Sequence, residues 1–420
     1  MKNRLTNWVL ILTLSILPSL VFSQDWFLSY SSSNRLNKVF TLDVNHAYAV
    51  GPGGFFVRTT NGGFTWEQVQ TNTTKQLFDV QFINSMTGFI CGDTGTMLKS
   101  IDGGTSWNPC TTNTTLNLRS ICFINNNIGW ISGSSSYSAL QINADTGVIL
   151  KTTNGGSTFS VSKTLNEGVQ KIAAFNPDTC LAISDAYSNK TIWRTTNSGA
   201  TWQSVHSGGF NVSLTSIVTF PYGVAYIPNA IQNLYSTHDF GASWDSSSLA
   251  SGQVVTDMSF PSPDTGYSAG YDAMAGVGNL FVSLDGGQIW TSQFGEKPFI
   301  SINFANDTCG FACTSDGYIY KHGIIDGINP QPQAIKQGFK FYPNPVTSSI
   351  NFSIQSNSSI QSYFYIVDIY SVDGKKLLEY SFHGRSFKMD GLQILSSGTY
   401  SLVVSDQSSI LYSTKFIKKE

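Results

Sequence analysis

The eight residues SIDGGTSW at 100–107 decide the fold of this 420-residue chain, because close copies of the string recur along the sequence. The copies are TTNGGFTW from Thr59, TTNGGSTF from Thr152, TTNSGATW from Thr195, THDFGASW from Thr237 and SLDGGQIW from Ser283, with Ile289 departing from the pattern. The aromatic residues that close the strings follow at steps of 41 to 52 residues, mostly near 42. Such a period is typical of the four-stranded blade of a β-propeller.

The residues between the strings repeat as well. In residues 77–100, LFDVQFINSMTGFICGDTGTMLKS, an alternating strand leads through a turn ending in Gly88 to a second strand, a glycine-containing turn and a third strand. The same order starts at Leu36, Leu118, Val169, Leu214, Val255 and Phe299. We therefore predict an all-β protein with a seven-bladed propeller at 24–323, a linker at 324–340 and a small C-terminal β-sandwich at 341–420.

Seven units but only six strings raise the question of how the ring closes. The unit from Phe299 ends at Tyr320-Lys321-His322 without a fourth strand, whereas Trp26 to Tyr30 reads as a fourth strand without a blade. Pairing Trp26–Tyr30 with the strand near Tyr318–Lys321 would close the ring and protect its edges.

The recurring string suits a structural turn better than a catalytic site. Its Asp or Asn can accept backbone N–H bonds, its fifth-position Gly permits a left-handed backbone, and its aromatic residue can pack between strands. A catalytic site needs one pocket, whereas six strings are spread around the rim. Each string holds at most one carboxylate, while calcium takes six to eight oxygens. We assign structural roles to Asn61, Asp102, Asn154, Asn197, Asp239, Asp285, Trp66, Trp107, Phe159, Trp202, Trp244 and Trp290.

These strings resemble the Asp-box, or bacterial neuraminidase repeat, and residues 26–323 resemble the photosystem II assembly/stability factor-like family. The resemblance implies a propeller but does not define an activity. Asp-boxes occur in sialidases, xyloglucanases, sortilin-type receptors and non-enzymatic assembly factors, and fold alone does not determine function.

The N-terminus is typical of a secretory signal peptide at 1–23. Lys2 and Arg4 precede an apolar run from Val9 to Leu20, and Ser23 completes a small-residue cleavage site. The run is shorter than a typical transmembrane helix.

The net charge of −2 indicates no basic surface of the kind that binds nucleic acid. Export permits disulfides, yet the spacing of Cys91, Cys110, Cys122, Cys180, Cys309 and Cys313 favours buried thiols and leaves any pairing open.

The C-terminal segment has its own pattern. FYPNPVTSSI at 341–350, SGTYSLVV at 397–404 and KFIKK at 415–419 alternate like short strands, and Glu420 follows the basic end. Together they resemble a type A C-terminal sorting domain of type IX secretion. That resemblance implies export across the outer membrane, contact with the secretion machinery and removal of the tail. A carbohydrate-binding sandwich is the alternative.

The sequence holds no convincing catalytic set. A sialidase-like site needs three arginines, a tyrosine nucleophile and a glutamate base, but the predicted propeller has only Arg35, Arg58, Arg119, Arg194, Glu67, Glu167 and Glu296. Arg58 and Arg194 precede boxes, as Lys99 and Lys151 do. The histidines show no metal-ligand spacing: His46, His206, His238, His322 and His383. Asp79 and Asp257 could form the carboxylate pair of a glycosidase, although channel lining is the favoured interpretation.

We therefore expect a monomeric, exported propeller that binds a protein or glycan, without a cofactor or metal. The alternatives are a polysaccharide-active or sialidase-like hydrolase and a purely structural envelope component.

Turns between second and third strands should emerge opposite the boxes. They include residues 132–147, 184–190, 228–233 and 269–278. We predict a binding surface of Tyr137, Tyr187 and Tyr271 on these turns, with Asp79, Lys171 and Asp257 at the channel mouth. Plain solvated loops remain the alternative.

Overall fold

The computed structural model describes residues 26–135, 146–185, 190–207, 213–230, 233–249, 253–272, 274–295, 297–323, 339–354, 364–370, 376–384, 386–405 and 410–419. These residues confirm the all-β class, since they form strands, turns and three short 3₁₀ segments, at Pro52–Gly54 (η1), Asp93–Gly95 (η2) and Leu392–Ile394 (η3). The predicted signal peptide, and the linker up to residue 338, lie outside them.

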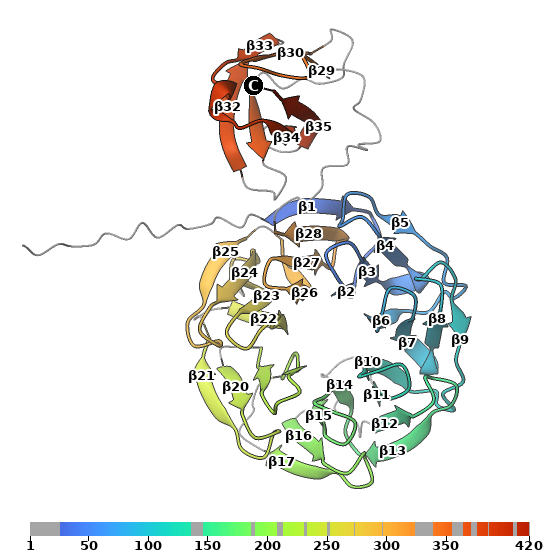
Figure 1. The fold of residues 1–420 in the computed structure, drawn as a ribbon. Coiled ribbons are helices and arrows are strands. Elements are labelled where there is room, and N and C mark those ends of the chain that lie inside the picture. The colour runs from blue at the N-terminus through green and yellow to red at the C-terminus, as the bar shows by residue number, and fades with distance from the viewer. Residues whose placement is uncertain are drawn as a thin grey trace, which may run out of the picture.

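The described residues from Trp26 to His322 form seven four-stranded antiparallel sheets that follow one another around a ring (Figure 1). We call each sheet a blade and count its strands from the inside outward. Blades one to three hold β2 (Lys38–Thr41), β3 (Ala47–Val50), β4 (Phe56–Thr59), β5 (Glu67–Gln68), β6 (Leu77–Phe82), β7 (Gly88–Gly92), β8 (Met97–Ser100), β9 (Asn108–Pro109), β10 (Asn117–Phe123), β11 (Gly129–Ser134), β12 (Gly147–Thr152) and β13 (Ser160–Leu165).

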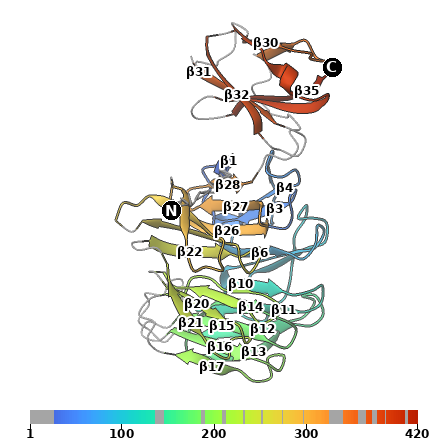
Figure 2. The same cartoon turned by 60° about the vertical axis from the view of Figure 1, so that its left-hand side comes forward.

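The later blades follow the same plan. Blades four to six hold β14 (Val169–Ala174), β15 (Cys180–Asp185), β16 (Lys190–Thr195), β17 (Gln203–Ser207), β18 (Val218–Thr219), β19 (Ala225–Pro228), β20 (Asn233–Thr237), β21 (Asp245–Ser248), β22 (Gln253–Ser259), β23 (Gly266–Asp272), β24 (Gly278–Ser283) and β25 (Thr291–Phe294). Blade seven holds β26 (Phe299–Asn306), β27 (Cys309–Thr314), β28 (Tyr318–His322) and, at its outer edge, β1 (Trp26–Ser31). Figure 2 shows the blades from the side, with the turns gathered at the two faces of the ring.

Composition changes from the inside of each blade to its outside. The second strands are mostly apolar and buried, as in Ala47–Val50 and Gly88–Gly92, because blades cover both of their faces. The outer strands are polar and mostly exposed, as in Glu67–Gln68 and Asp245–Ser248. This gradient orients each blade with its apolar layers inside the ring.

The predicted closure of the ring is confirmed. Strand β1 pairs antiparallel with β28, with Trp26 opposite His322 and Phe27 opposite Lys321. Trp26 is buried and packs against the rings of Phe304 and His322, at centroid distances of 5.8 and 4.9 Å. The first and last parts of the propeller therefore share one sheet.

Neighbouring blades are joined by stacked aromatic rings. Tyr48 of blade one stacks on Phe82 of blade two at 3.5 Å between centroids, and Phe89 stacks on Phe123 of blade three at 3.7 Å. Tyr226 with Phe260 and Tyr267 with Phe304 repeat this contact at 4.1 and 3.6 Å. In each pair the second strand of one blade covers the inner strand of the next.

The C-terminal residues form two packed sheets, as a sandwich requires. One contains β29 (Phe339–Tyr342), β30 (Ile350–Ile354) and β33 (Ser386–Met389), and the other contains β31 (Phe364–Tyr370), β32 (Lys376–His383), β34 (Gly398–Ser405) and β35 (Ile410–Lys418). Buried side chains such as Phe352, Val367 and Phe416 form its core. This core is separate from those of the propeller.

Candidate functional site

Each Asp-box is a self-contained hydrogen-bonded turn. In the box from Ser100, the Asp102 carboxylate accepts the Ser106 N–H at 3.0 Å and the Ser106 hydroxyl at 2.6 Å, while the Ser100 hydroxyl oxygen accepts the Gly104 N–H at 2.8 Å. Bonds from Ser106 lower the pKa of Asp102 to about 2. Gly104 has φ of 81°, the left-handed region that glycine adopts without strain. These side-chain groups are used within the turn, so they are not aimed at a ligand.

The boxes also anchor neighbouring strands on one face of the ring. The fourth box residue donates its N–H to the turn between the first two strands of its own blade, as from Gly62 to the Asn45 carbonyl and from Gly103 to the Met86 carbonyl. Bonds of this kind recur from Gly155, Ser198, Phe240 and Gly286. The box face is therefore stabilised as a connected rim.

Cations that precede the boxes bridge to the next blade. Arg58 donates to the Gly103 carbonyl at 2.7 Å, Lys99 to Gly155 at 2.7 Å and Lys151 to Ser198 at 2.8 Å. Arg194 makes the equivalent bond to Phe240 at 2.7 Å. Arg58 also pairs with Glu67 at 2.9 Å. These contacts place both arginines outside any carboxylate-binding triad.

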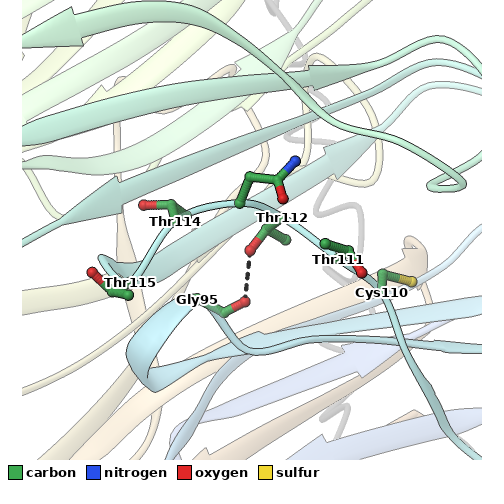
Figure 3. Close-up of a pocket in the computed structure, with 7 residues that line it drawn as sticks. Gly95, Cys110, Thr111, Thr112, Thr114 and Thr115 are labelled. Carbon is green, nitrogen blue, oxygen red and sulfur yellow. Dashed lines mark hydrogen bonds between the residues drawn. The ribbon is translucent and has the colours of Figure 1, made fainter.

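Turns between second and third strands pack against the links between blades, on the side away from the boxes. Gly54 donates its N–H to the Lys75 carbonyl at 2.7 Å, and Gly95 donates to Leu116 at 2.8 Å. Figure 3 shows a hollow beside Gly95, where the Thr112 hydroxyl donates to the Gly95 carbonyl at 2.9 Å. No side chain that lines it carries a charge, so this hollow offers little for a specific ligand.

One of the three predicted surface tyrosines is placed differently from the expectation. Tyr271 lies within β23, opposite Gly278 and Val254, and is half-buried rather than displayed on a loop. Extra residues in a hairpin can extend both strands in pairs, and residues 269–272 and 278 belong to β23 and β24. Tyr137 and Tyr187 lie outside the described residues.

A central cavity of about 320 Å³ is lined by all seven inner strands. In five of these strands the pairing register shifts just before one position, as between Leu77 and Asp79 or between Val169 and Lys171. Such bulges redirect side chains: four of the five precede a residue of the cavity wall, and the fifth precedes the buried Ser301. Six lining residues come from the equivalent position of their blades, and the buried Ser301 occupies that position in blade seven. We name this set the polar ring: Lys38, Asp79, Ser120, Lys171, Ser216, Asp257 and Ser301.

Asp257 is the centre of a bonded network in the polar ring. Its carboxylate accepts the Lys38 ammonium at 2.7 Å and the hydroxyls of Ser216 and Ser301 at 2.7 and 2.8 Å. It also accepts the backbone N–H of Met258 and Ile302. Burial by itself would raise the pKa of Asp257, but the Lys38 charge and these bonds outweigh it, so the pKa is lowered.

The other two predicted mouth residues also line the cavity. Asp79 accepts the backbone N–H of Val80 at 2.9 Å and of Ile121 at 3.0 Å. Burial, followed by the charge of Lys38, lowers the pKa of Lys171. Sequence reasoning missed four members of the ring, although each occupies the position of Asp79 in its own repeat: Lys38, Ser120, Ser216 and Ser301.

The described part of the chain contains no cluster of metal ligands and no disulfide. No group of three or more His, Cys, Asp or Glu side chains there could hold a metal ion. All six cysteines are free thiols, and four of them are buried. No helix among the described residues is long and apolar enough to cross a membrane.

Comparison with known families agrees with the geometry. Residues 59–264 match the family described as photosynthesis system II assembly factor YCF48, and residues 340–419 match the secretion system C-terminal sorting domain. The chain carries a YCF48-like propeller and a sorting domain. The sorting domain indicates secretion or cell-surface display through the type IX system. No curated protein matches the sequence.

Solved structures share the fold of this YCF48-like chain at low identity. YCF48 from Cyanidioschyzon merolae has a TM-score of 0.58 at 18% identity, covering 71% of this chain and 98% of its own. YCF48 bound to D1 peptide has a TM-score of 0.56 at 19% identity, covering 71% and 94%. The GH74 xyloglucanase from Xanthomonas campestris has a TM-score of 0.57 at 10% identity, covering 88% and 68%. These identities support a shared fold and no more.

Proposed function

We propose that the chain is an exported, non-enzymatic propeller that binds a surface protein or glycan on the face opposite its Asp-boxes. The signal peptide at 1–23 directs it to the periplasm. Residues 341–420 then engage the type IX machinery, and the propeller reaches the cell surface or is released. Binding involves Tyr137, Tyr187 and Tyr271 together with the mouth of the central cavity.

The non-enzymatic part of this proposal rests on the two carboxylates of the cavity, which are already bonded to other groups of the protein. A glycoside hydrolase needs one carboxyl group to give a proton and another to act as base or nucleophile. Asp257 is ionised, ion-paired with Lys38 and hydrogen-bonded by two serines. Both oxygens of Asp79 accept backbone N–H groups. Neither group is arranged as a proton donor to a substrate.

The hydrolase alternative rests on two carboxylates that share one cavity and on the xyloglucanase-like fold. Release of reducing ends from xyloglucan, abolished by Asp79→Asn or Asp257→Asn, would establish it. We expect no release from the wild-type chain. A peptide is bound in one of the YCF48 structures, which supports a protein partner for this chain instead.

A pair of tyrosine variants tests the proposed face. The mature chain, residues 24–420, would be immobilised to capture envelope proteins and glycans, and the affinity of each captured component measured. We expect the triple variant Tyr137→Ala, Tyr187→Ala, Tyr271→Ala to bind at least about tenfold more weakly, as loss of interface aromatics does. Tyr222→Ala is the matched control, because Tyr222 is 54% exposed and lies between the first two strands of blade five, on the box face. Undiminished affinity in the triple variant would exclude this face.

The role of residues 341–420 in export can be tested separately. Cells that produce the chain without residues 341–420 should retain a folded propeller in the periplasm. Fractionation that finds the truncated protein at the cell surface would contradict the assigned role of the tail.

A further inference from the structure

The polar ring divides into a bonded half and an open half. Lys38, Ser216, Asp257 and Ser301 form the network already described. The open half consists of Asp79, Ser120 and Lys171, from three consecutive blades. Neither the Lys171 ammonium nor the Ser120 hydroxyl has a partner within hydrogen-bond distance among the described residues, and both side chains line the cavity.

Lys171 occupies a position that elsewhere joins two blades. The ring residue of one blade accepts an N–H of the next, as Asp79 does from Ile121 at 3.0 Å and Ser301 from Val39 at 3.3 Å. Asp257 accepts from Ile302 in the same way at 3.2 Å. An ammonium group has three donors and no acceptor, so Lys171 cannot make this bond. The Lys171 amine therefore does not join its own blade to the next one through such a bond.

The Lys171 amine lies in a partly closed space and forms no ion pair with any residue that the structure describes. Burial and then the Lys38 charge lower the pKa of Lys171, whereas the charges of Asp257 and Asp79 act in the opposite direction. Desolvating an unpaired cation is unfavourable, and a bound anion would offset that cost. The Ser120 hydroxyl, on the neighbouring inner strand, can donate a second hydrogen bond to the same anion.

We propose that Lys171 and Ser120 form a seat for one carboxylate group of a ligand that enters the central cavity. The inference rests on the proposed binding function, and it names the ligand group that the cavity mouth takes. Asp79 and Asp257 also line the cavity, and they would repel a dianion such as sulfate more strongly than a singly charged carboxylate. A cavity of about 320 Å³ admits a small organic acid or the acidic end of a larger ligand.

Calorimetric titration of the mature chain, residues 24–420, tests this site with defined probes. L-lactate is the small carboxylate, D-galacturonate stands for an acidic glycan, and N-acetylalanine stands for a peptide C-terminus. Lactamide and sulfate are the neutral and dianionic controls. We expect the best carboxylate to bind at least tenfold more tightly than lactamide or sulfate, and the ranking of the three carboxylates identifies the source.

Three variants decide whether the lysine is responsible. Lys171→Met should weaken carboxylate binding at least tenfold without loss of melting temperature, and Lys171→Arg should retain measurable binding. Lys75→Met is the control, because Lys75 is an exposed lysine on a blade link and its loss should change nothing. Failure of every carboxylate to bind the wild-type chain would overturn the proposal, and so would equal binding by folded Lys171→Met.

The titration also separates this inference from the proposed function, because it needs no macromolecular partner. Partner capture that depends on the tyrosines, with no carboxylate binding to the wild-type chain, would overturn the carboxylate seat alone. Carboxylate binding that depends on Lys171 supports the seat even where the tyrosine variants leave partner capture unchanged.

Discussion

Neighbouring blades are joined in two different ways on the box face. After blades one to four, a cation from the third strand donates to the fourth residue of the next box, as Lys151 does to Ser198. After blades five and six, the third strand offers Ser236 and Val282 at that place. There a tyrosine from the second strand takes over the bond to the next blade. Tyr226 donates to the Pro263 carbonyl at 3.2 Å and Tyr267 to Asp307 at 2.8 Å.

At each of these six seams a side-chain donor bonds to the next blade, whether it is charged or neutral. Blade one contains both kinds of possible donor to the next blade, the third-strand cation Arg58 and the second-strand tyrosine Tyr48. Arg58 bonds to the next box, and the buried Tyr48 hydroxyl has no hydrogen-bond partner in the described structure. Ring closure adds a contact of another kind, because β1 completes the sheet of blade seven.

Removal of β1 should have the largest effect, because it opens the ring. Deletion of residues 24–31 exposes the edge of β28 and removes buried Trp26. We expect a loss of about 5 kcal/mol or more, which corresponds to a fall in melting temperature of about 10 °C or more. Leu28→Ser, at a position 52% exposed on the same strand, is the control and should leave calorimetric melting unchanged. An unaltered melting temperature after deletion would contradict closure by β1.

The same seam should make stability depend on pH. His322 is fully buried among aromatic rings, and desolvation lowers its pKa from 6.5 to about 4. The neutral form is favoured in the folded state, so its contribution is complete above pH 6.5 and is lost as the pH falls to about 4. That difference corresponds to about 3 kcal/mol. Urea unfolding between pH 7 and 4 should be less pH-dependent in His322→Phe than in the wild type, and equal slopes would exclude this role.

Loss of a cation bridge should cost less than loss of the closing strand. Lys151→Met keeps the length of the side chain but removes the bond to Ser198 and the contact with the Trp130 ring, 4.4 Å from the amine. We expect a destabilisation of about 1.5 kcal/mol in urea unfolding. Lys163→Met, on an outer strand of the same blade, serves as the comparison and should cost less, because Lys163 makes a ring contact with Trp193 but no cross-blade hydrogen bond among the described residues. Equal effects would contradict a special role for the bridge.

The tyrosine seam gives the smallest effect and a difference in sign. Tyr267→Phe removes the bond to Asp307 and should destabilise the fold by about 1 kcal/mol. Tyr48→Phe removes a buried hydroxyl without a described partner, so it should be neutral or slightly stabilising. Both changes keep the aromatic stacks with Phe304 and Phe82. Equal losses in the two variants would show that the hydroxyls are not used differently.

Much of the propeller could be predicted because its signals are local. The box from Ser100 contains its own donors, acceptors and left-handed glycine, so eight residues specify the turn. The period of the boxes specifies repeated blades, and the orphan strand at Trp26 matches the missing strand after His322. The prediction that Tyr271 lies on a loop was wrong, because β23 continues through it. Pairing between the two strands of a hairpin, and not the number of inserted residues, determines where a strand ends.

The sequence by itself determined the all-β class, the turn chemistry of the boxes and the closure by β1, because these depend on short-range pattern and on counting repeats. Only the tertiary structure decided which polar groups meet inside the ring. Lys38 and Asp257 are 219 residues apart and belong to non-adjacent blades, yet their charged atoms lie 2.7 Å apart. Ring curvature and the bulges of the inner strands bring such side chains into one cavity, and neither is encoded in the pattern of a single repeat.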